Sequence, residues 1–227
     1  MSKLRALEIA LWTASAVALA LVVWMMADRT VFQAYKEWVF ERKLGEQGRQ
    51  GKAPGERSPA EPHRAPWPLP GPAPRLRTLP PESMVGRVEI PRLGMKALIL
   101  EGTSSRALRR AVGHIEGTSL PGDGGNTGLA GHRDTFFRQL KNINLGDVIR
   151  VHTLDGMFDY VVESTGVVAP ERIEVLNATA SPALTLVTCY PFSYVGSAPN
   201  RFIVRARQVN AVYRSGAGQR AASAPAP

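Results

Sequence analysis

Short β-forming runs separated by turn residues dominate the chain between Glu82 and Asn210, and they constrain its fold more than any other feature. Val, Ile, Leu and aromatic residues favour strands, whereas Gly, Pro, Asn and Asp favour the turns between them. Asp155-Gly156 separates two runs and is a strong hairpin signal. The runs occupy residues 85–91, 96–100, 127–131, 148–153, 157–168, 184–190 and 202–208. They predict an all-β domain, either a barrel or a sandwich.

Two short helical stretches are expected within this domain. Ser104 or Ser105 can cap a helix that runs to Ala111, since a serine hydroxyl accepts a hydrogen bond from a free backbone N–H. Residues 136–140 form a second helical turn. Neither stretch is long enough to change the fold class.

An uncharged apolar run from Ile9 to Met26 precedes the domain. A helix of this length spans about 27 Å, close to the thickness of a bilayer core. Lys3 and Arg5 precede the run, so the positive-inside rule places residues 1–8 in the cytoplasm and the rest of the chain outside. A cleaved signal peptide is the alternative, but no small-residue cleavage site follows. We therefore expect a transmembrane anchor at residues 9–27.

The remaining segments differ in composition. Residues 28–44 carry apolar side chains at helical spacing, which predicts an amphipathic helix near the lipid headgroups. Residues 45–81 are rich in proline and glycine and predict an extended linker. The folded domain is expected at residues 82–210, and residues 211–227 are expected to form a disordered tail.

The chain is strongly basic, with a formal net charge of +9. We interpret this charge as proximity to an anionic membrane or wall rather than to nucleic acid, because no nucleic-acid-binding motif accompanies it. The four histidines, the single cysteine and the scattered carboxylates show no metal-ligand spacing. We therefore predict no metal site and no cofactor.

Cys189, the only cysteine, ends the run at residues 184–190. It cannot form an internal disulfide, so it is either a small buried hydrophobe or a reactive thiol. Pro191 follows and cannot donate to a sheet, so the cysteine stands where a strand meets a loop. No helix N-terminus is available there to activate the thiol, and a neighbouring cation would have to do so.

His132 and Arg201 are the candidate partners of that thiol. Cysteine catalysis needs a thiolate, a proton donor for the leaving group and a group that holds the oxyanion. Arg201 follows the cysteine closely, so an antiparallel hairpin could set the two side by side. His132 lies far upstream, and spacing alone does not place it near Cys189. His114 could line a groove or be a structural histidine, and His152 is expected to be exposed.

Three motifs together resemble the sortases, which are membrane-anchored cysteine transpeptidases. The sequence Thr-Leu-Val-Thr-Cys at residues 185–189 matches their Thr-Leu-x-Thr-Cys motif. Gly131-His132-Arg133 is similar to their histidine motif, and Arg201 stands where their essential arginine follows the cysteine. Residues 113–126 also resemble the lead-in to that histidine. The residues after the cysteine and the histidine are most similar to class D sortases.

The resemblance implies a closed β-barrel of about eight strands with a groove leading to Cys189. It implies cleavage of a C-terminal Leu-Pro-x-Thr-(Gly/Ala) sorting signal on a secreted protein through a Cys189 thioacyl intermediate. His132 would shuttle the proton, and Arg201 would hold the oxyanion. The acceptor would be an amine of peptidoglycan or of a pilin, and no substrate-binding residues are assigned.

Two alternatives remain at this point. The chain could be a cysteine peptidase in which water resolves the thioester, because acceptor choice depends on access to the groove. It could also be a non-catalytic β-barrel that binds envelope polymer or pilin through its basic face. In each case the resemblance implies a protein of the cell membrane with its folded domain outside.

Overall fold

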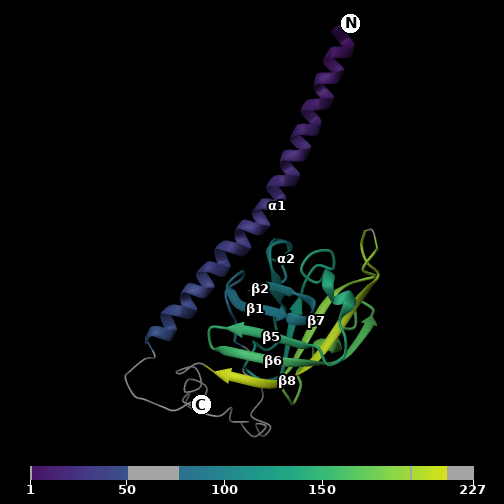
Figure 1. Ribbon diagram of the computed structural model, residues 1–227. Coiled ribbons are helices and arrows are strands. Elements are labelled where there is room, and N and C mark those ends of the chain that lie inside the picture. The colour runs from purple at the N-terminus through teal and green to yellow at the C-terminus, as the bar shows by residue number, and fades with distance from the viewer. Residues whose placement is uncertain (1, 51–76, 195, 214–227) are drawn as a thin grey trace.

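The structure is a computed structural model that describes residues 2–50, 77–194 and 196–213. A long helix, α1 (Ser2–Gln50), precedes a compact barrel (Figure 1). The strands are β1 (Met84–Ile90), β2 (Met95–Glu101), β3 (Val112–His114), β4 (Asn126–Ala130), β5 (Val148–Thr153), β6 (Gly156–Val168), β7 (Ala183–Tyr190) and β8 (Asn200–Tyr213). The short helices are η1 (Pro91–Leu93), α2 (Ser105–Arg110), η2 (Arg138–Asn142) and η3 (Ile173–Leu176).

The strands of the described residues close into one eight-stranded barrel in the order β1-β2-β3-β4-β7-β8-β6-β5. The pairs β2–β3 and β4–β7 are parallel, and the other pairs are antiparallel. The prediction of an all-β barrel is therefore confirmed, as is a short helix capped by Ser104, whose hydroxyl accepts from the Ala107 N–H at 3.1 Å. The second helical turn lies slightly later than expected, in η2.

The barrel core follows the period-two pattern of its strands. Leu184 and Leu186 of β7 point inward with Val204 and Ala206 of β8, and all four are fully buried. Because alternate residues of a strand face opposite sides, Cys189 and Arg201 lie on the outer face of the same sheet. The sequence pattern that fills the core thus also decides which residues can meet a ligand outside it.

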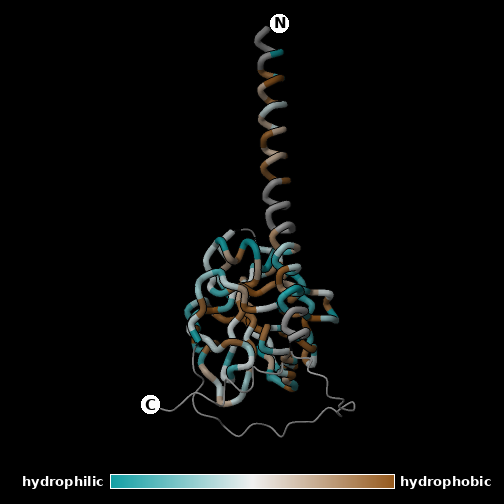
Figure 2. The backbone as a smooth tube through the Cα atoms, turned by 90° about the vertical axis from the view of Figure 1, so that its left-hand side faces the viewer, coloured by the Kyte–Doolittle hydropathy of each residue, from teal (hydrophilic) through white to brown (hydrophobic). Residues whose placement is uncertain are grey.

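The C-terminal half of α1 packs on the outside of the barrel. Phe40 is fully buried, and Phe32 packs against an apolar cluster of Leu98, Leu100 and Ala111. The Gln33 side-chain oxygen accepts a hydrogen bond from the Leu98 N–H at 3.3 Å. Figure 2 shows α1 rising away from the barrel beyond this contact. Within the segment expected at residues 28–44, Phe32 and Phe40 therefore contact the protein's own barrel, whereas Tyr35 and Trp38 are exposed.

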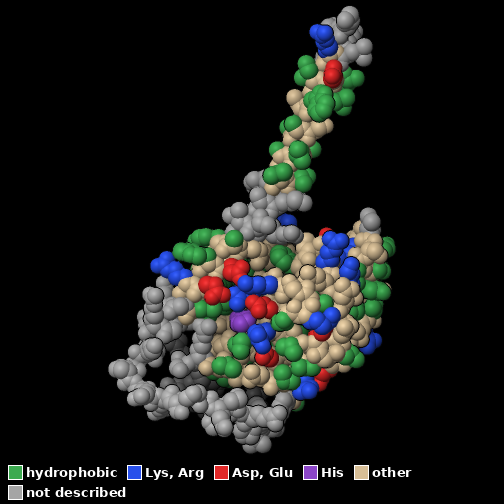
Figure 3. All heavy atoms as spheres, in the orientation of Figure 1, with side chains coloured by type: hydrophobic (Ala, Val, Ile, Leu, Met, Phe, Trp, Pro, Cys, Tyr) green, Lys and Arg blue, Asp and Glu red, His purple; other side chains and the backbone are tan. Residues whose placement is uncertain are grey.

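Charged side chains reinforce this contact between α1 and the barrel. Arg87 of β1 is buried and forms ion pairs with Glu37 at 3.4 Å and with Glu41, both on α1. It also pairs with Glu89 at 2.8 Å, and Lys96 of β2 pairs with Glu37. Acidic and basic side chains gather on this face of the molecule (Figure 3). The helix is thus joined to the barrel by apolar packing and by ion pairs.

The structure describes some of the segments expected from the sequence and leaves others outside the described residues. Residues 45–50 belong to α1, so the linker expected from residue 45 begins as helix. The rest of that linker up to residue 76 and the tail from residue 214 lie outside the described residues. β8 continues to Tyr213, beyond the domain end expected at residue 210. Among the residues that the structure describes, no helix is both long enough and apolar enough to cross a membrane.

Candidate active site

Cys189 and Arg201 face each other across two neighbouring antiparallel strands. The register of β7 with β8 pairs Cys189 directly with Arg201, and Thr188 with Phe202. Opposed residues of such a pair have Cβ atoms about 4.5–5.5 Å apart. The hairpin arrangement expected from the sequence is therefore present, and it brings the thiol and the guanidinium to one end of the barrel.

His132 reaches the same end through the parallel pairing of β4 with β7. Ala130 pairs with Val187, and the Gly131 N–H donates to the Val187 carbonyl at 3.1 Å. The Thr188 hydroxyl then donates to the Gly131 carbonyl at 2.7 Å. Continuing this register by two residues puts His132 level with Cys189. The strand pairing thus places His132 at the same end of the barrel as Cys189 and Arg201.

A close approach of backbone and ring fixes the loop that carries His132. A Cβ on Gly131 would lie 2.7 Å from the ring of Phe137, which is fully buried, so only glycine fits. The Phe137 N–H donates to the His132 carbonyl at 3.0 Å and closes a tight turn. The histidine therefore stands at the start of a loop held by the core.

Arg133 ties the histidine loop to the connection between β7 and β8. Its Nη2 donates to the Tyr194 carbonyl at 2.6 Å and to the Gly196 carbonyl at 3.0 Å. Its guanidinium also lies 5.9 Å from the centre of the Tyr194 ring. These contacts join the loop after His132 to the loop between Cys189 and Arg201. Sequence reasoning counted Arg133 only as part of a motif and missed this contact.

The guanidinium of Arg201 is oriented by its own loop. Nη1 donates to the carbonyls of Ala198 at 3.3 Å and Asn200 at 3.1 Å. The side chain is half-buried, and five N–H donors leave several for a bound oxygen atom. Asp134 is exposed, and none of the hydrogen bonds or ion pairs of the described residues joins it to His132. The pair Cys189 and His132 thus has no carboxylate partner among the described contacts.

Aromatic rings close the barrel end behind the thiol. Tyr190, Phe192 and Phe202 are half-buried and mutually packed, with ring centres 6.0, 6.2 and 5.3 Å apart. Phe192 and Phe202 also pack against the barrel core. This cluster places apolar side chains next to Cys189, which is a half-buried free thiol.

His114 is a buried, hydrogen-bonded residue, as one of the two readings of the sequence expected. Its Nδ1 lies 2.8 Å from the Glu101 carboxylate, and its Nε2 lies 3.1 Å from the Ser119 carbonyl. The Thr118 hydroxyl also lies 3.1 Å from Nε2, so both ring nitrogens have partners. This pair links the neighbouring strands β2 and β3 within the sheet of the barrel and has a structural role.

His152 differs from the expectation because it is half-buried rather than exposed. It lies beside Glu89 on the face that α1 covers, with its Nε2 3.6 Å from that carboxylate. Burial lowers the pKa of His152, and the nearby charge of Arg87 lowers it further. The residue belongs to the contact with α1, not to the end of the barrel that carries Cys189.

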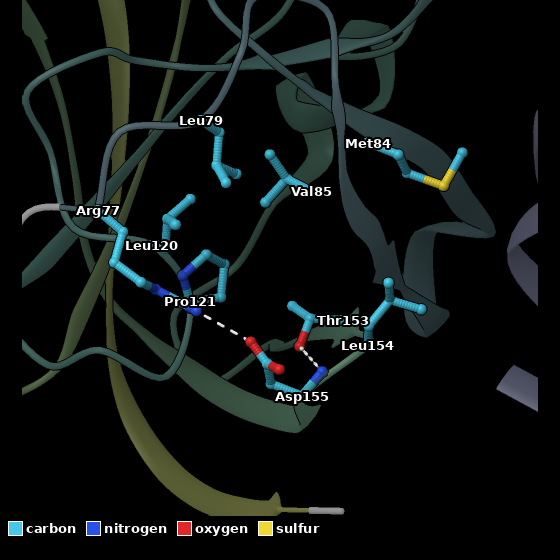
Figure 4. Close-up of a pocket in the computed structure, with 9 residues that line it drawn as sticks. All are labelled: Arg77, Leu79, Met84, Val85, Leu120, Pro121, Thr153, Leu154 and Asp155. Atoms are coloured by element: carbon cyan, nitrogen blue, oxygen red, sulfur yellow. Dashed lines mark hydrogen bonds and ion pairs between the residues drawn. The ribbon is translucent and has the colours of Figure 1, made fainter. Parts of the chain in front are cut away.

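Figure 4 shows a pocket of about 160 Å³ that lies away from Cys189. Its lining includes Val85, Leu120 and Thr153, and Arg77 closes one side through ion pairs with Asp123 at 2.7 Å and Asp155 at 3.2 Å. β6 begins here, whereas its end pairs with Arg201. The pocket is therefore separate from Cys189. The described residues contain no group of three or more His, Cys, Asp or Glu that could hold a metal ion.

Comparison with known proteins gives one consistent result. The family model described as "Sortase domain" matches residues 88–209. Sortase D of Bacillus subtilis (strain 168) is 37% identical over 125 residues, which are 55% of this chain and 63% of that protein. The chain thus spans less than two thirds of that relative's length.

Solved structures agree with the family model. Sortase C from Clostridium perfringens SM101 is 32% identical, with a TM-score of 0.53 over 58% of this chain and 73% of that one. A sortase D5 transpeptidase from Clostridium perfringens is 22% identical, with a TM-score of 0.57 over 80% of this chain and 98% of that one, and this likeness shows the fold alone. Because the family model matches more than half of the chain, the chain belongs to the sortase family.

Proposed function

We propose that this chain cleaves a Leu-Pro-x-Thr-(Gly/Ala) sorting signal at the C-terminus of a secreted protein and joins that protein to an amine of the cell envelope or of a pilin. The observation that carries the proposal is the strand register. β7 and β8 set Cys189 against Arg201, and β4 brings His132 to the same level. At this end of the barrel, Cys189 would supply the nucleophile, His132 the proton carrier and Arg201 the oxygen-binding cation.

The reaction would proceed through two acyl transfers. The Cys189 thiolate attacks the threonine carbonyl, and His132 as imidazolium protonates the departing amine of glycine or alanine. Arg201 donates hydrogen bonds to the developing oxyanion, for which its planar fork is better matched than an ammonium group. The acceptor amine then attacks the thioester, His132 takes its proton, and Cys189 leaves as thiolate.

The proposal includes a membrane anchor at residues 9–27 with residues 1–8 in the cytoplasm. The supporting feature is the uncharged run from Ile9 to Met26, of which the described side chains end at Val23. Its large apolar side chains are exposed, including Leu11, Trp12 and Leu19. Exposed apolar side chains in such number on one helix favour contact with lipid. The basic net charge is consistent with an anionic surface nearby.

The test is product analysis with the purified full chain and a quenched Leu-Pro-x-Thr-(Gly/Ala) peptide library, with and without an added amine. We expect cleavage after threonine, a mass increase on Cys189 equal to the acyl fragment, and a product joined to the amine. The Cys189→Ala variant should fold normally and lose all three signals, because the bond to sulfur cannot form.

The other functions correspond to distinct outcomes of the same experiment. Cleavage that requires Cys189 but never joins the amine would show a peptidase that only hydrolyses. No mass change on Cys189 with any peptide of the library, together with full cellular function of Cys189→Ala, would show a binding module. Either result overturns the transpeptidase proposal.

A further inference from the structure

The connection between β6 and β7, residues 169–182, covers part of the outer sheet face that carries Cys189. We call this connection the wall. Within it, η3 brings Leu176 onto β4, where a Cβ on Gly128 would lie 3.0 Å from the Leu176 side chain. Gly128 pairs with Thr185 in the parallel ladder of β4 and β7. The wall therefore rests on the same two strands that position His132 and Cys189.

One buried side chain joins the wall to these strands. Asn126, the first residue of β4, is 1% exposed, and its Nδ2 donates to the carbonyls of Val175 at 3.1 Å and Asn177 at 3.2 Å. Its Oδ1 accepts from the hydroxyl of Thr185, which is fully buried, at 2.8 Å. Every polar atom of the amide is thus used. Arg205 of β8 adds a longer hydrogen bond to the Val175 carbonyl at 3.4 Å.

We propose that Asn126 is a positioning residue that fixes the wall over the sheet before a sorting signal binds. This inference rests on the proposed function, because it assigns the wall to one side of the site for the signal peptide. A loop that is already ordered in the free protein loses less conformational entropy when a ligand binds. Holding the wall in place therefore increases the affinity for the sorting signal. Asn126 lies at the start of β4, whereas His132 follows its end, so its effect is on binding rather than on the chemistry at Cys189.

The substitution Asn126→Asp tests this role with almost no change in shape. Aspartate has no N–H to donate, and its oxygen atoms would face the two wall carbonyls without a hydrogen. We expect the KM of the full chain for the sorting-signal peptide to rise roughly tenfold or more, with kcat within about threefold, as for lost binding rather than lost chemistry. Asn142→Asp, the same change at an exposed position on η2, should alter neither constant.

Amide hydrogen exchange tests the wall without any need for activity. Residues 173–177 should exchange faster in Asn126→Asp than in the parent chain, while the core strands remain protected. Thr185→Val removes the hydroxyl that holds the Asn126 amide and should have the same effect, so the test survives if Asn126→Asp fails to fold. Thr185→Ser keeps the hydroxyl and should leave exchange in the wall slow.

The outcomes separate this inference from the proposed function. Unchanged exchange in the wall of both Asn126→Asp and Thr185→Val would overturn it. A fall in kcat with unchanged KM, together with slower alkylation of Cys189 by iodoacetamide, would also overturn it, because Asn126 would then act on the thiol. If the parent chain cleaves no peptide, the proposed function fails, and the exchange experiment still decides whether Asn126 fixes the wall.

Discussion

Single residues at the cysteine end of the barrel owe their positions to backbone register rather than to long side chains. Cys189 and Arg201 are opposed in β7 and β8, and the Thr188 hydroxyl fastens the strand to Gly131 just before His132. Such an arrangement tolerates little change in the length or shape of a side chain. Its consequences are clearest at Arg201.

Replacing Arg201 with lysine should damage activity nearly as much as replacing it with alanine. Lysine keeps the charge but loses the planar set of donors that can hold an oxyanion and the Ala198 and Asn200 carbonyls together. Loss of one oxyanion donor costs on the order of 10²–10³ in kcat. Steady-state kinetics on the sorting-signal peptide measure the effect.

The matched control is Arg207→Lys on the same strand. Arg207 is exposed and ion-paired with Glu163 at 2.9 Å, so its replacement should leave kcat unchanged. An Arg201→Lys variant that is as active as the parent chain would remove the oxyanion role from Arg201.

At the scale of elements, α1 and the barrel form one packed unit through Phe32, Phe40 and the ion pairs of Arg87. Removing a fully buried phenylalanine costs about 3–5 kcal/mol, enough to release a docked helix. In Phe40→Ala we therefore expect residues 32–44 to exchange amide hydrogens faster and to become sensitive to protease, with the barrel still folded. Hydrogen exchange on the full chain measures both regions.

Tyr35→Ala is the control for this experiment, since Tyr35 is 59% exposed on the same helix. It should leave exchange in residues 32–44 unchanged. Equal exchange in Phe40→Ala and the parent chain would show that Phe40 does not hold the helix on the barrel.

Much of the barrel is predictable from local patterns. Alternating β-branched residues and turn residues located six of the strands to within one residue and the middle of β8, which is longer at both ends than its predicted run, because each run is long enough to show its period. β3 was missed since it has three residues, with Gly113 in the middle. The opposition of Cys189 and Arg201 was also predictable, because a short loop joins antiparallel neighbours.

Contacts between distant segments were not predictable. The parallel pairing of β4 with β7, which places His132, joins residues far apart in sequence and leaves no local signal. The same holds for Asn126, whose partners Val175 and Asn177 contribute backbone atoms that carry no sequence identity. The sequence predicted a helix at residues 28–44, but it did not indicate that Phe32 and Phe40 pack on the barrel while Tyr35 and Trp38 stay exposed, because apolar residues look the same whether lipid or a protein surface covers them.

At the scale of the whole molecule, one ion pair between η1 and the loop before β5 makes the stability of the barrel depend on pH. Arg92 of η1 binds Asp147 in the loop before β5, and the Asn144 N–H donates to the same carboxylate at 2.8 Å. The hydrogen bond from Arg92 is the main cause that holds the pKa of Asp147 below its usual value, although burial opposes it. The side chain of Asp147 is 6% exposed and that of Arg92 is 45% exposed, so solvent screens this pair from the arginine side only.

This lowered pKa predicts how stability changes with pH. A carboxylate with a lowered pKa in the folded state stabilises it above the unfolded pKa of about 3.9, and this stability is lost as the pH falls through the folded pKa. Asp147→Asn should therefore cost about 1–3 kcal/mol at pH 7 and progressively less below pH 4. Urea unfolding of the full chain at several pH values measures this difference.

Glu171→Gln, at an exposed carboxylate, should follow the parent chain at every pH. If Asp147→Asn were as destabilising at pH 3 as at pH 7, the ionised carboxylate would not be the source of the stability.

The docking of α1 also decides how far the catalytic end can travel. As a flexible coil, the linker expected at residues 45–81 would have a root-mean-square reach of roughly 30–35 Å. Because residues 32–44 are packed on the barrel, the rigid helix sets the distance between the barrel and whatever holds the N-terminal half of α1. β8 begins on the side of the barrel toward which that half of the helix points (Figure 1). The barrel is then held at a fixed distance from whatever holds the N-terminal half of α1. The local concentration of its Cys189 end at that distance no longer depends on the length of the linker.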